Sequence, residues 1–225
     1  MSLYFKVLLF SFIIPFIFSF HQKIKFYKFF KQIAASLSLI GFFFIIWDIY
    51  FTKIGVWGFD KKHHSSIMLS NLPLEEVLFF FVIPFVCVFT YFVLSEKKVL
   101  NLNINTTFLK LICILLIVLA VLFFKNAYTI SVLILTILIL LYIIYYRPDW
   151  IGYFFSMYLI IHVFPFLLVN GVLTGYITDL PPVWYDSNNI IGVRLGTIPV
   201  EDFLYSFILL FLNTSLFEYL RKKTI

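Results

Sequence analysis

Two pairs of adjacent acidic residues stand out in this sequence, because each pair follows a proline and leads directly into a long apolar segment. The first pair is Glu75-Glu76, in Pro-Leu-Glu-Glu, and the second is Glu201-Asp202, in Pro-Val-Glu-Asp. Corresponding residues of the two motifs lie 126 positions apart. Carboxyl groups are unfavourable beside segments of membrane length, so acids placed there indicate a function. The chemistry that they offer is proton donation and acceptance.

The composition indicates an integral membrane protein. Of the 225 residues, 63% are hydrophobic and 12% are charged, whereas a soluble domain is about half apolar and a quarter charged. Since each membrane span takes about 20 residues, the spans leave no room for a second, soluble domain. The net charge of +6 is typical of basic cytoplasmic loops in such a protein, and we do not expect nucleic acid as a partner.

We expect an all-α fold of about seven transmembrane helices. Hydropathy predicts spans at residues 3–20, 33–52, 74–94, 107–124, 127–146, 150–169 and 200–220. A shift of 126 residues places the first span on the fifth and the third on the seventh, and matches the second to the sixth less well. We therefore predict two parallel three-helix repeats, residues 1–95 and 127–225, with a connecting span in residues 96–126.

Basic residues in the loops predict the orientation. With the N-terminus outside, eleven Lys and Arg residues lie on the inner side and six on the outer side. This bias favours an outer N-terminus and a cytoplasmic C-terminus, in a multi-pass protein of the cell inner membrane. Because parallel repeats enter the membrane in the same direction, both acid pairs then lie on the outer side.

Two interpretations of the four acids remain open. Carboxylates in a first turn stabilise a helix start, because they face the positive end of the helix dipole. Alternatively, an apolar cavity and a neighbouring carboxyl keep one acid protonated, which makes it a general acid. Adjacent helix residues point about 100° apart, so we expect at most one acid of each pair to face a shared cavity. The other would bind a loop residue or Arg194.

The loops that precede the two motifs share a weaker pattern. Asp48 precedes Trp57, and Asn170 precedes Trp184, with a threonine four residues after the acid or amide in each case. The order is shared, although the spacing drifts. We expect the two outer loops to form a paired lid over the acids. An interfacial aromatic belt explains the two tryptophans equally well.

The motifs resemble the membrane-integral lycopene cyclases, in the form in which two related subunits are fused into one chain. The resemblance rests on residues 73–76 and 198–205, on the Asp48 and Asn170 elements and on residues 192–196, and it covers nearly the whole chain. It implies closure of the linear ψ-ends of lycopene to β-ionone rings, giving γ-carotene and then β-carotene without net redox change.

The resemblance also implies a set of site residues. The catalytic candidates are Glu75, Glu76, Glu201 and Asp202. The supporting or substrate-binding candidates are Asp48, Asn170, Arg194, Phe79 and Tyr205. Aromatic rings next to the acids suit this reaction, since a ring face attracts a carbocation as it attracts other cations.

Other enzyme classes that act on such substrates lack their signatures here. No Gly-x-Gly-x-x-Gly follows a strand, so we expect no flavin and no other cofactor. The Asp-rich magnesium sites of a prenyltransferase are also missing. An iron oxygenase needs several histidine ligands, but only His162 lies within a span, and we interpret it as a buried hydrogen-bonding residue. The span at 200–220 contains no lysine, which argues against a retinal photoreceptor.

The alternative function is a small transporter or channel that uses the acids as a proton or cation relay. A relay needs acids spread through the membrane depth, whereas these acids cluster at one level, which favours a single site. The partners that we expect are lycopene or a related carotenoid, membrane lipid, and other enzymes of the carotenoid pathway.

Overall fold

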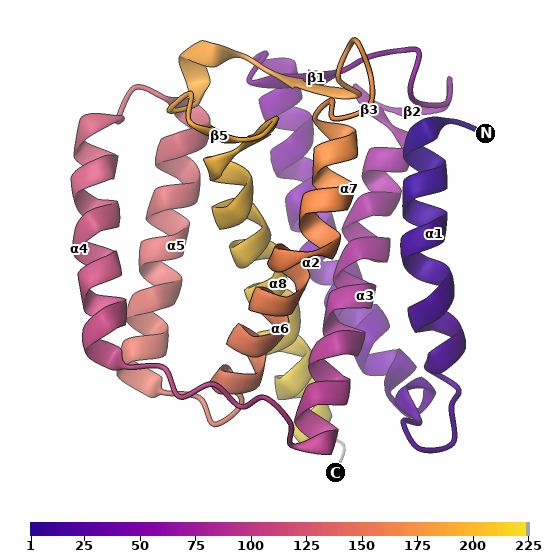
Figure 1. Cartoon of the computed structure of the whole chain (residues 1–225), viewed down its shortest axis with the longest axis vertical. Helices are drawn as coiled ribbons and strands as arrows, with labels where there is room; N and C mark the ends of the chain where they lie inside the picture. Colours follow the sequence, from indigo (N-terminus) through magenta and orange to yellow (C-terminus); the bar gives the residue numbers. More distant parts are fainter. Residues whose placement is uncertain (224–225) are drawn as a thin grey trace.

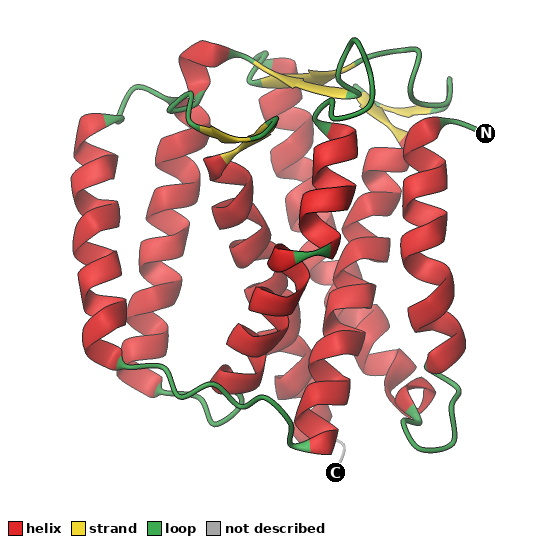
Figure 2. Cartoon of the chain, viewed as in Figure 1, coloured by secondary structure: helices red, strands yellow, loops and turns green. Residues whose placement is uncertain are grey.

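The computed structural model describes residues 1–223, and α-helices make up most of it (Figures 1 and 2). The helices are α1 (Leu3–Phe18), α2 (Phe30–Lys53), α3 (Leu74–Lys97), α4 (Thr106–Leu122), α5 (Ala127–Tyr146), α6 (Ile151–Val163), α7 (Pro165–Leu173) and α8 (Val200–Lys222). Two 3-10 helices, η1 (Phe26–Phe29) and η2 (Ser187–Asn189), lie in the connections. α1 starts at one end of the bundle, and α8 ends at the other (Figure 1).

Four helical segments are long and apolar enough to cross a membrane. They are Phe26–Lys53, which combines η1 and α2, and the helices α3, α5 and α8. The bent pair of α6 and α7 adds a fifth when it is counted as one span. α1 and α4 are apolar but contain only 16 and 17 residues. A helix that crosses the bilayer core usually needs about 20. The chain is therefore a helical membrane protein, and the count of seven spans stays a prediction.

The predicted sixth span, residues 150–169, corresponds to two helices that meet at a bend. α6 ends at Val163 and α7 begins at Pro165, with a bend of 52° between them. Proline has no N–H and its ring clashes with the preceding turn, which favours a break before Pro165, in the first turn of α7. Proline alone does not dictate the break, because Pro15 and Pro84 lie inside α1 and α3. Hydropathy misses this break, because Phe164 and Phe166 on either side of the proline are apolar.

Short strands join the loops at the end of the bundle where α3 and α8 begin (Figure 2). β1 (Trp57–Phe59) pairs antiparallel with β4 (Val183–Tyr185), with Trp57 opposite Tyr185. Two hairpins lie beside this pair, β2 (Met68–Leu69) with β3 (Leu72–Pro73) and β5 (Arg194–Leu195) with β6 (Ile198–Pro199). The all-α prediction omits these strands, but the expected pairing of the two loops is present as β1–β4.

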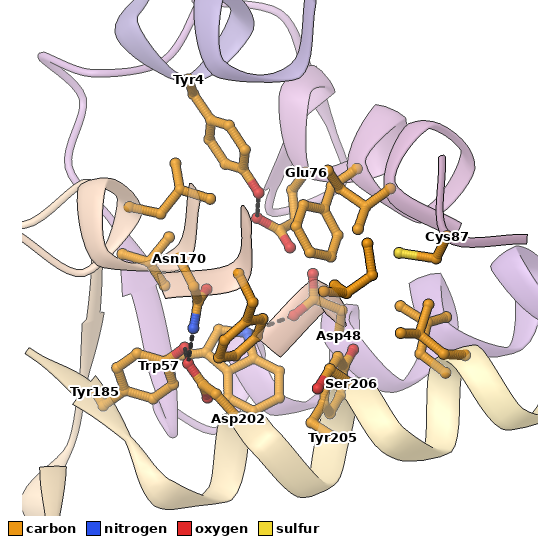
Figure 3. A pocket seen from close by; sticks show the side chains of 18 of the residues that line it. Tyr4, Asp48, Trp57, Glu76, Cys87, Asn170, Tyr185, Asp202, Tyr205 and Ser206 are labelled. Atoms are coloured by element: carbon orange, nitrogen blue, oxygen red, sulfur yellow. Dashed lines mark hydrogen bonds between the residues drawn. The ribbon is translucent and has the colours of Figure 1, made fainter. Parts of the chain in front are cut away.

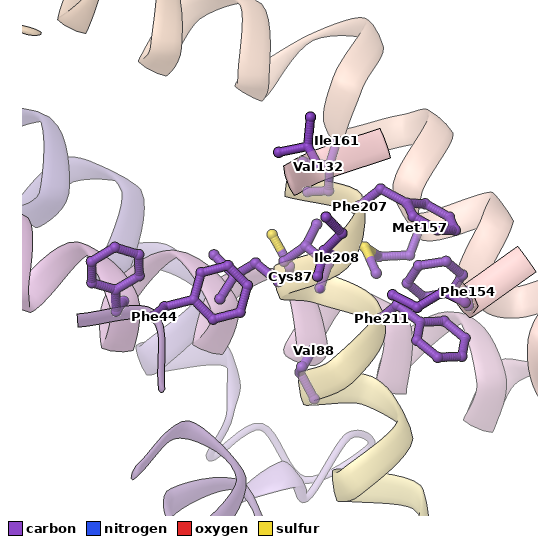
Figure 4. Packing of buried hydrophobic residues seen from close by; sticks show 14 of the residues in the cluster. Phe44, Cys87, Val88, Val132, Phe154, Met157, Ile161, Phe207, Ile208 and Phe211 are labelled. Carbon is purple, nitrogen blue, oxygen red and sulfur yellow. The ribbon is translucent and has the colours of Figure 1, made fainter. Parts of the chain in front are cut away.

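Aromatic and aliphatic side chains fill the centre of the bundle (Figure 4). Phe44 of α2, Phe154 of α6 and Ile208 of α8 are completely buried there. A polar contact reinforces the packing, since the Ser36 hydroxyl of α2 donates to the backbone oxygen of Asn213 in α8 over 2.8 Å. Close packing of this kind holds the starts of α3 and α8 in fixed positions relative to each other.

The opposite end of the bundle carries a largely buried cluster of charges. Glu218 of α8 is only 5% exposed and lies 3.2 Å from the guanidinium of Arg221. Arg221 also binds Glu96 near the end of α3, over 2.5 Å, and its guanidinium lies over the rings of Phe29 and Phe92. These contacts tie the end of α8 to α3 and η1, at the far end from the acid motifs (Figure 1).

Candidate active site

Each acid pair occupies the first turn of its helix and follows a hairpin with a two-residue loop. Ser70 and Gly196, the first residues of the two loops, have positive φ values of 59° and 63°, as type II′ hairpin turns require. Each hairpin ends in a proline, Pro73 or Pro199, whose extended backbone caps the helix. Proline fits this position because the missing N–H has no partner at a helix start.

Glu75 and Glu201, the first acid of each pair, bind the loop that precedes their own helix. Glu75 Oε1 accepts a hydrogen bond from the backbone N–H of Ser65 over 2.7 Å. Glu201 Oε1 accepts one from the backbone N–H of Ile191 over 2.6 Å. Each also accepts a hydroxyl hydrogen bond from a residue at the start of α1 or α5. Both side chains are buried, and they lie outside the cavity described below.

Glu76, the second acid of the first pair, faces the interior (Figure 3). Its Oε2 accepts a hydrogen bond from the Tyr4 hydroxyl of α1 over 2.6 Å. Asp48 of α2 lies nearby and accepts a hydrogen bond of 2.5 Å from the indole N–H of Trp57. The other oxygen of Asp48 is buried and has no hydrogen-bond partner among residues 1–223.

Asp202, the second acid of the other pair, accepts three hydrogen bonds. The Tyr128 hydroxyl donates to Oδ1 over 2.8 Å. The Asn170 amide and the Tyr185 hydroxyl donate to Oδ2 over 2.7 and 2.9 Å. Burial and the charge of Asp202 raise the pKa of Tyr185 well above its ordinary value, so this hydroxyl keeps its proton and remains a donor.

Glu76, Asp48 and Asp202 line one small cavity, with a volume of about 90 Å³. Most of the remaining wall is apolar, and its aromatic rings include Trp57, Phe59, Phe79, Phe166, Tyr185 and Tyr205. β1 and β4 contribute wall residues beside the acids, whereas Cys87 lies away from them (Figure 3). Such a site can deliver a proton to an apolar molecule and surround the resulting cation with ring faces.

The structure brings most of the predicted supporting residues to this cavity. Asn170, Phe79 and Tyr205 line it together with Asp48. Arg194 does not line it. Its exposed side chain stays within its own hairpin, where Nη1 donates to the Thr197 carbonyl oxygen over 2.6 Å, and the guanidinium lies 5.7 Å from the centre of the Tyr185 ring. Backbone N–H groups, rather than Arg194, therefore hold the acid of each pair that faces away from the cavity.

A comparison with known families decides the identity of the chain. The family model described as lycopene cyclase matches residues 1–94 and 125–220, two segments that include both acid motifs. The chain belongs to the lycopene cyclase family. This confirms the resemblance seen in the motifs and assigns the chain to carotenoid cyclisation in general terms. Comparisons with curated proteins and with solved structures found no match.

The sequence alone does not predict several contacts in the cavity. Tyr4 and Tyr128 both donate to a cavity acid, but they lie 124 positions apart, so the shift of 126 does not align them. Trp57 is 5% exposed, so an interfacial belt does not explain it, whereas Trp184 is 44% exposed and still fits that explanation. His162 is buried and hydrogen-bonded as expected, to the Tyr158 carbonyl oxygen over 2.7 Å, and it also lines the cavity.

The titratable residues of this family member do not form an evident metal site. Within residues 1–223, no group of three or more His, Cys, Asp or Glu residues is placed to hold a metal ion. The two cysteines, Cys87 and Cys113, are free and buried. The wall of the cavity itself carries carboxyl groups and aromatic rings.

Proposed function

We propose that this chain is a lycopene β-cyclase, which closes the linear ψ-ends of lycopene to β-ionone rings and forms γ-carotene and then β-carotene. One observation carries the proposal. Carboxyls from both acid motifs, Glu76 and Asp202, meet in a single cavity whose remaining wall is mostly apolar and aromatic. Protonation of an unactivated alkene needs an acid held against an apolar substrate, and this cavity has that composition.

The reaction uses only proton transfer. A cavity carboxyl protonates C2 of the terminal alkene, which leaves a cation at C1. The electron pair of the C5–C6 double bond attacks C1 and closes the ring, so the positive charge moves to C5. Loss of the proton on C6 restores the double bond. One proton is taken up and one is released, so there is no net redox change and we expect no need for a flavin.

The site residues divide by their position. Glu76 and Asp202 act on the substrate, with Asp48 and Asn170 as supporting residues that touch the same cavity. Phe79, Tyr205 and other rings of the wall stabilise the cation, as ring faces do for cations in general. Glu75 and Glu201 hold the outer loops, and Arg194 lies in one of these loops.

The proposed architecture is two parallel repeats, residues 1–95 and 127–225, with α4 as the connector. Several structural features recur at a distance of 126 residues and support it. Leu74 N–H donates to the Ile67 carbonyl oxygen, and Val200 N–H donates to that of Val193. The bonds from Ser65 and Ile191 to the first acid of each pair recur at the same distance. The two segments matched by the family model are a further support.

We place the protein in the cell inner membrane with its N-terminus outside and its C-terminus in the cytoplasm, as the loop charges predict. A reporter that is active only in the cytoplasm should be active when it is fused after Ile225. The same reporter should be inactive when it is inserted after Lys61, in the loop before α3. The reverse pattern of the two fusions would mean that the acid motifs lie on the cytoplasmic side.

The function is tested in a cell that accumulates lycopene. Expression of this chain should convert the pigment to γ-carotene and β-carotene, and the purified protein should do the same in detergent without added flavin. The amount of protein in the membrane is measured in parallel through a C-terminal tag. Unchanged lycopene in the presence of folded, membrane-inserted protein would refute the cyclase function.

A further inference from the structure

The three carboxyls of the cavity differ in the number of donors that they face. Asp202 accepts three hydrogen bonds, and both of its oxygens are used. Glu76 accepts one, from Tyr4 to Oε2. Asp48 accepts one, from Trp57. This difference separates Asp202 from the other two, because hydrogen bonds donated to a carboxylate favour its ionised form.

Asp202 has the surroundings of a permanent carboxylate. The Asn170 amide nitrogen donates to Oδ2 and has no free lone pair with which to accept a hydrogen bond. Tyr185 shares the same oxygen, and Tyr128 takes the other. A proton on Oδ2 would face the Asn170 NH2 group, which cannot accept it, and a proton on Oδ1 would require the Tyr128 hydroxyl to turn from donor to acceptor. Either change loses a hydrogen bond that the ionised carboxylate accepts. Asp202 therefore supplies a fixed negative charge at the cavity wall.

Glu76 has the surroundings of a proton donor. Tyr4 holds Oε2, and within the described residues Oε1 has no hydrogen-bond partner and is not enclosed by protein. The side chain points into the cavity from the first turn of α3 (Figure 3). A proton on Oε1 is thus available to an apolar molecule in the cavity and would displace no existing hydrogen bond.

Asp48 is less suited to reach a substrate. One oxygen holds the Trp57 indole N–H, and the other is buried within the protein. Trp57 in turn lies 5.0 Å from the Tyr128 ring, measured between ring centroids. Asp48 is therefore a positioning residue that keeps the β1 indole in the cavity wall.

We propose that Glu76 is the proton donor of the cyclisation and that Asp202 remains ionised throughout and balances the positive charge. This assignment rests on the proposed function. The Glu76 carboxyl transfers its proton to C2, and the C1–C6 bond forms. C2 and C6 are both bonded to C1 in the ring, so the Glu76 carboxylate can then accept the proton that leaves C6. The enzyme returns to its starting state, with Glu76 protonated and Asp202 charged.

The assignment predicts different defects for two isosteric variants. Glu76→Gln should lower the rate of lycopene cyclisation by about 100-fold or more, the usual effect of removing a general acid. It should still bind the ammonium form of N,N-dimethylgeranylamine, which mimics the charged end group, as the native protein does. Asp202→Asn should bind this ammonium probe about tenfold more weakly or worse, because the attracting charge is gone.

Controls separate charge from shape and folding. Geraniol, an uncharged molecule of similar shape, should bind equally well to the native protein and to Asp202→Asn. Asp149→Asn makes the same chemical change at an exposed residue outside the cavity and should leave cyclisation and ammonium binding at native levels. Glu76→Asp, which keeps the acid on a shorter side chain, should recover part of the activity lost in Glu76→Gln.

The outcomes distinguish the assignment from the function on which it rests. If the native protein converts no lycopene, the cyclase function fails. If the native protein is active and Glu76→Gln is equally active, the cyclase function stands and the donor assignment is overturned. Unchanged ammonium affinity in Asp202→Asn would overturn the role of Asp202 as the fixed charge.

Discussion

Glu201→Ala is expected to release the loop before α8 and to abolish most of the cyclase activity, whereas Glu201→Gln retains most of it. Glu201 Oε1 accepts hydrogen bonds from the Ile191 N–H and the Thr129 hydroxyl, and alanine leaves both donors without a partner. Loss of bonds to a charged acceptor destabilises a contact by about 3 kcal/mol, which raises the population of the released loop about 100-fold. Glutamine keeps an oxygen in the same place and can accept both bonds.

Trypsin reports this release directly, because Arg194 is an exposed cleavage site in the same loop. We expect cleavage after Arg194 to be about 100-fold faster in Glu201→Ala than in the native protein. Glu76→Gln serves as the contrasting variant, since it should lose activity while the loop is cleaved at the native rate. An inactive Glu201→Gln with a native cleavage rate would mean that Glu201 takes part in proton transfer.

Asn170→Ala is expected to lower the cyclisation rate by about 10-fold to 100-fold while the protein stays folded. The Asn170 amide donates to Asp202 Oδ2 over 2.7 Å, and a hydrogen bond to a charged group contributes about 1.5–3 kcal/mol. Tyr185 and Tyr128 remain as donors, so Asp202 keeps part of its support. The loss should appear in the maximal rate more than in the substrate dependence, because the proposed role of the carboxylate is to balance the cation formed during the reaction.

The measurement compares initial rates of lycopene conversion in detergent at several substrate concentrations. Asn188→Ala is the matched control, because Asn188 is exposed in η2 and, among residues 1–223, its side-chain amide binds only the nearby Asp186. Its rate should stay within about twofold of the native value. A native rate for Asn170→Ala would mean that Asp202 does not depend on this donor.

The sequence is enough to identify a helical membrane protein, because the hydropathy of a segment depends only on its own residues. The apolar segments correspond to the helices observed, and residues 127–146 match α5 in both bounds. The constant shift of 126 residues also holds for the two hairpins, since a turn depends on its own few residues, such as Ser70 and Gly196. The break before Pro165 is the exception, because apolar residues surround it.

Which acid of each pair faces the cavity depends on helix packing, and the sequence predicts this only in part. The helix repeat indicates that Glu75 and Glu76 point in different directions, but not which of them meets the cavity. That choice depends on how α3 is rotated against α1 and α2, which places Tyr4 and Asp48 on the side of Glu76. No spacing along the chain encodes this rotation.

The sequence by itself determined a helical membrane protein with duplicated acid motifs and the family to which it belongs. Only the tertiary structure decided that Glu76 and Asp202 share one cavity, that Glu75 and Glu201 hold loops, and that Arg194 lies outside. Hydropathy and turn motifs are read from neighbouring residues. The hydrogen bonds to Glu76 and Asp202 from α1 and α5 join residues 72 and 74 positions apart, so they exist only once the helices have packed.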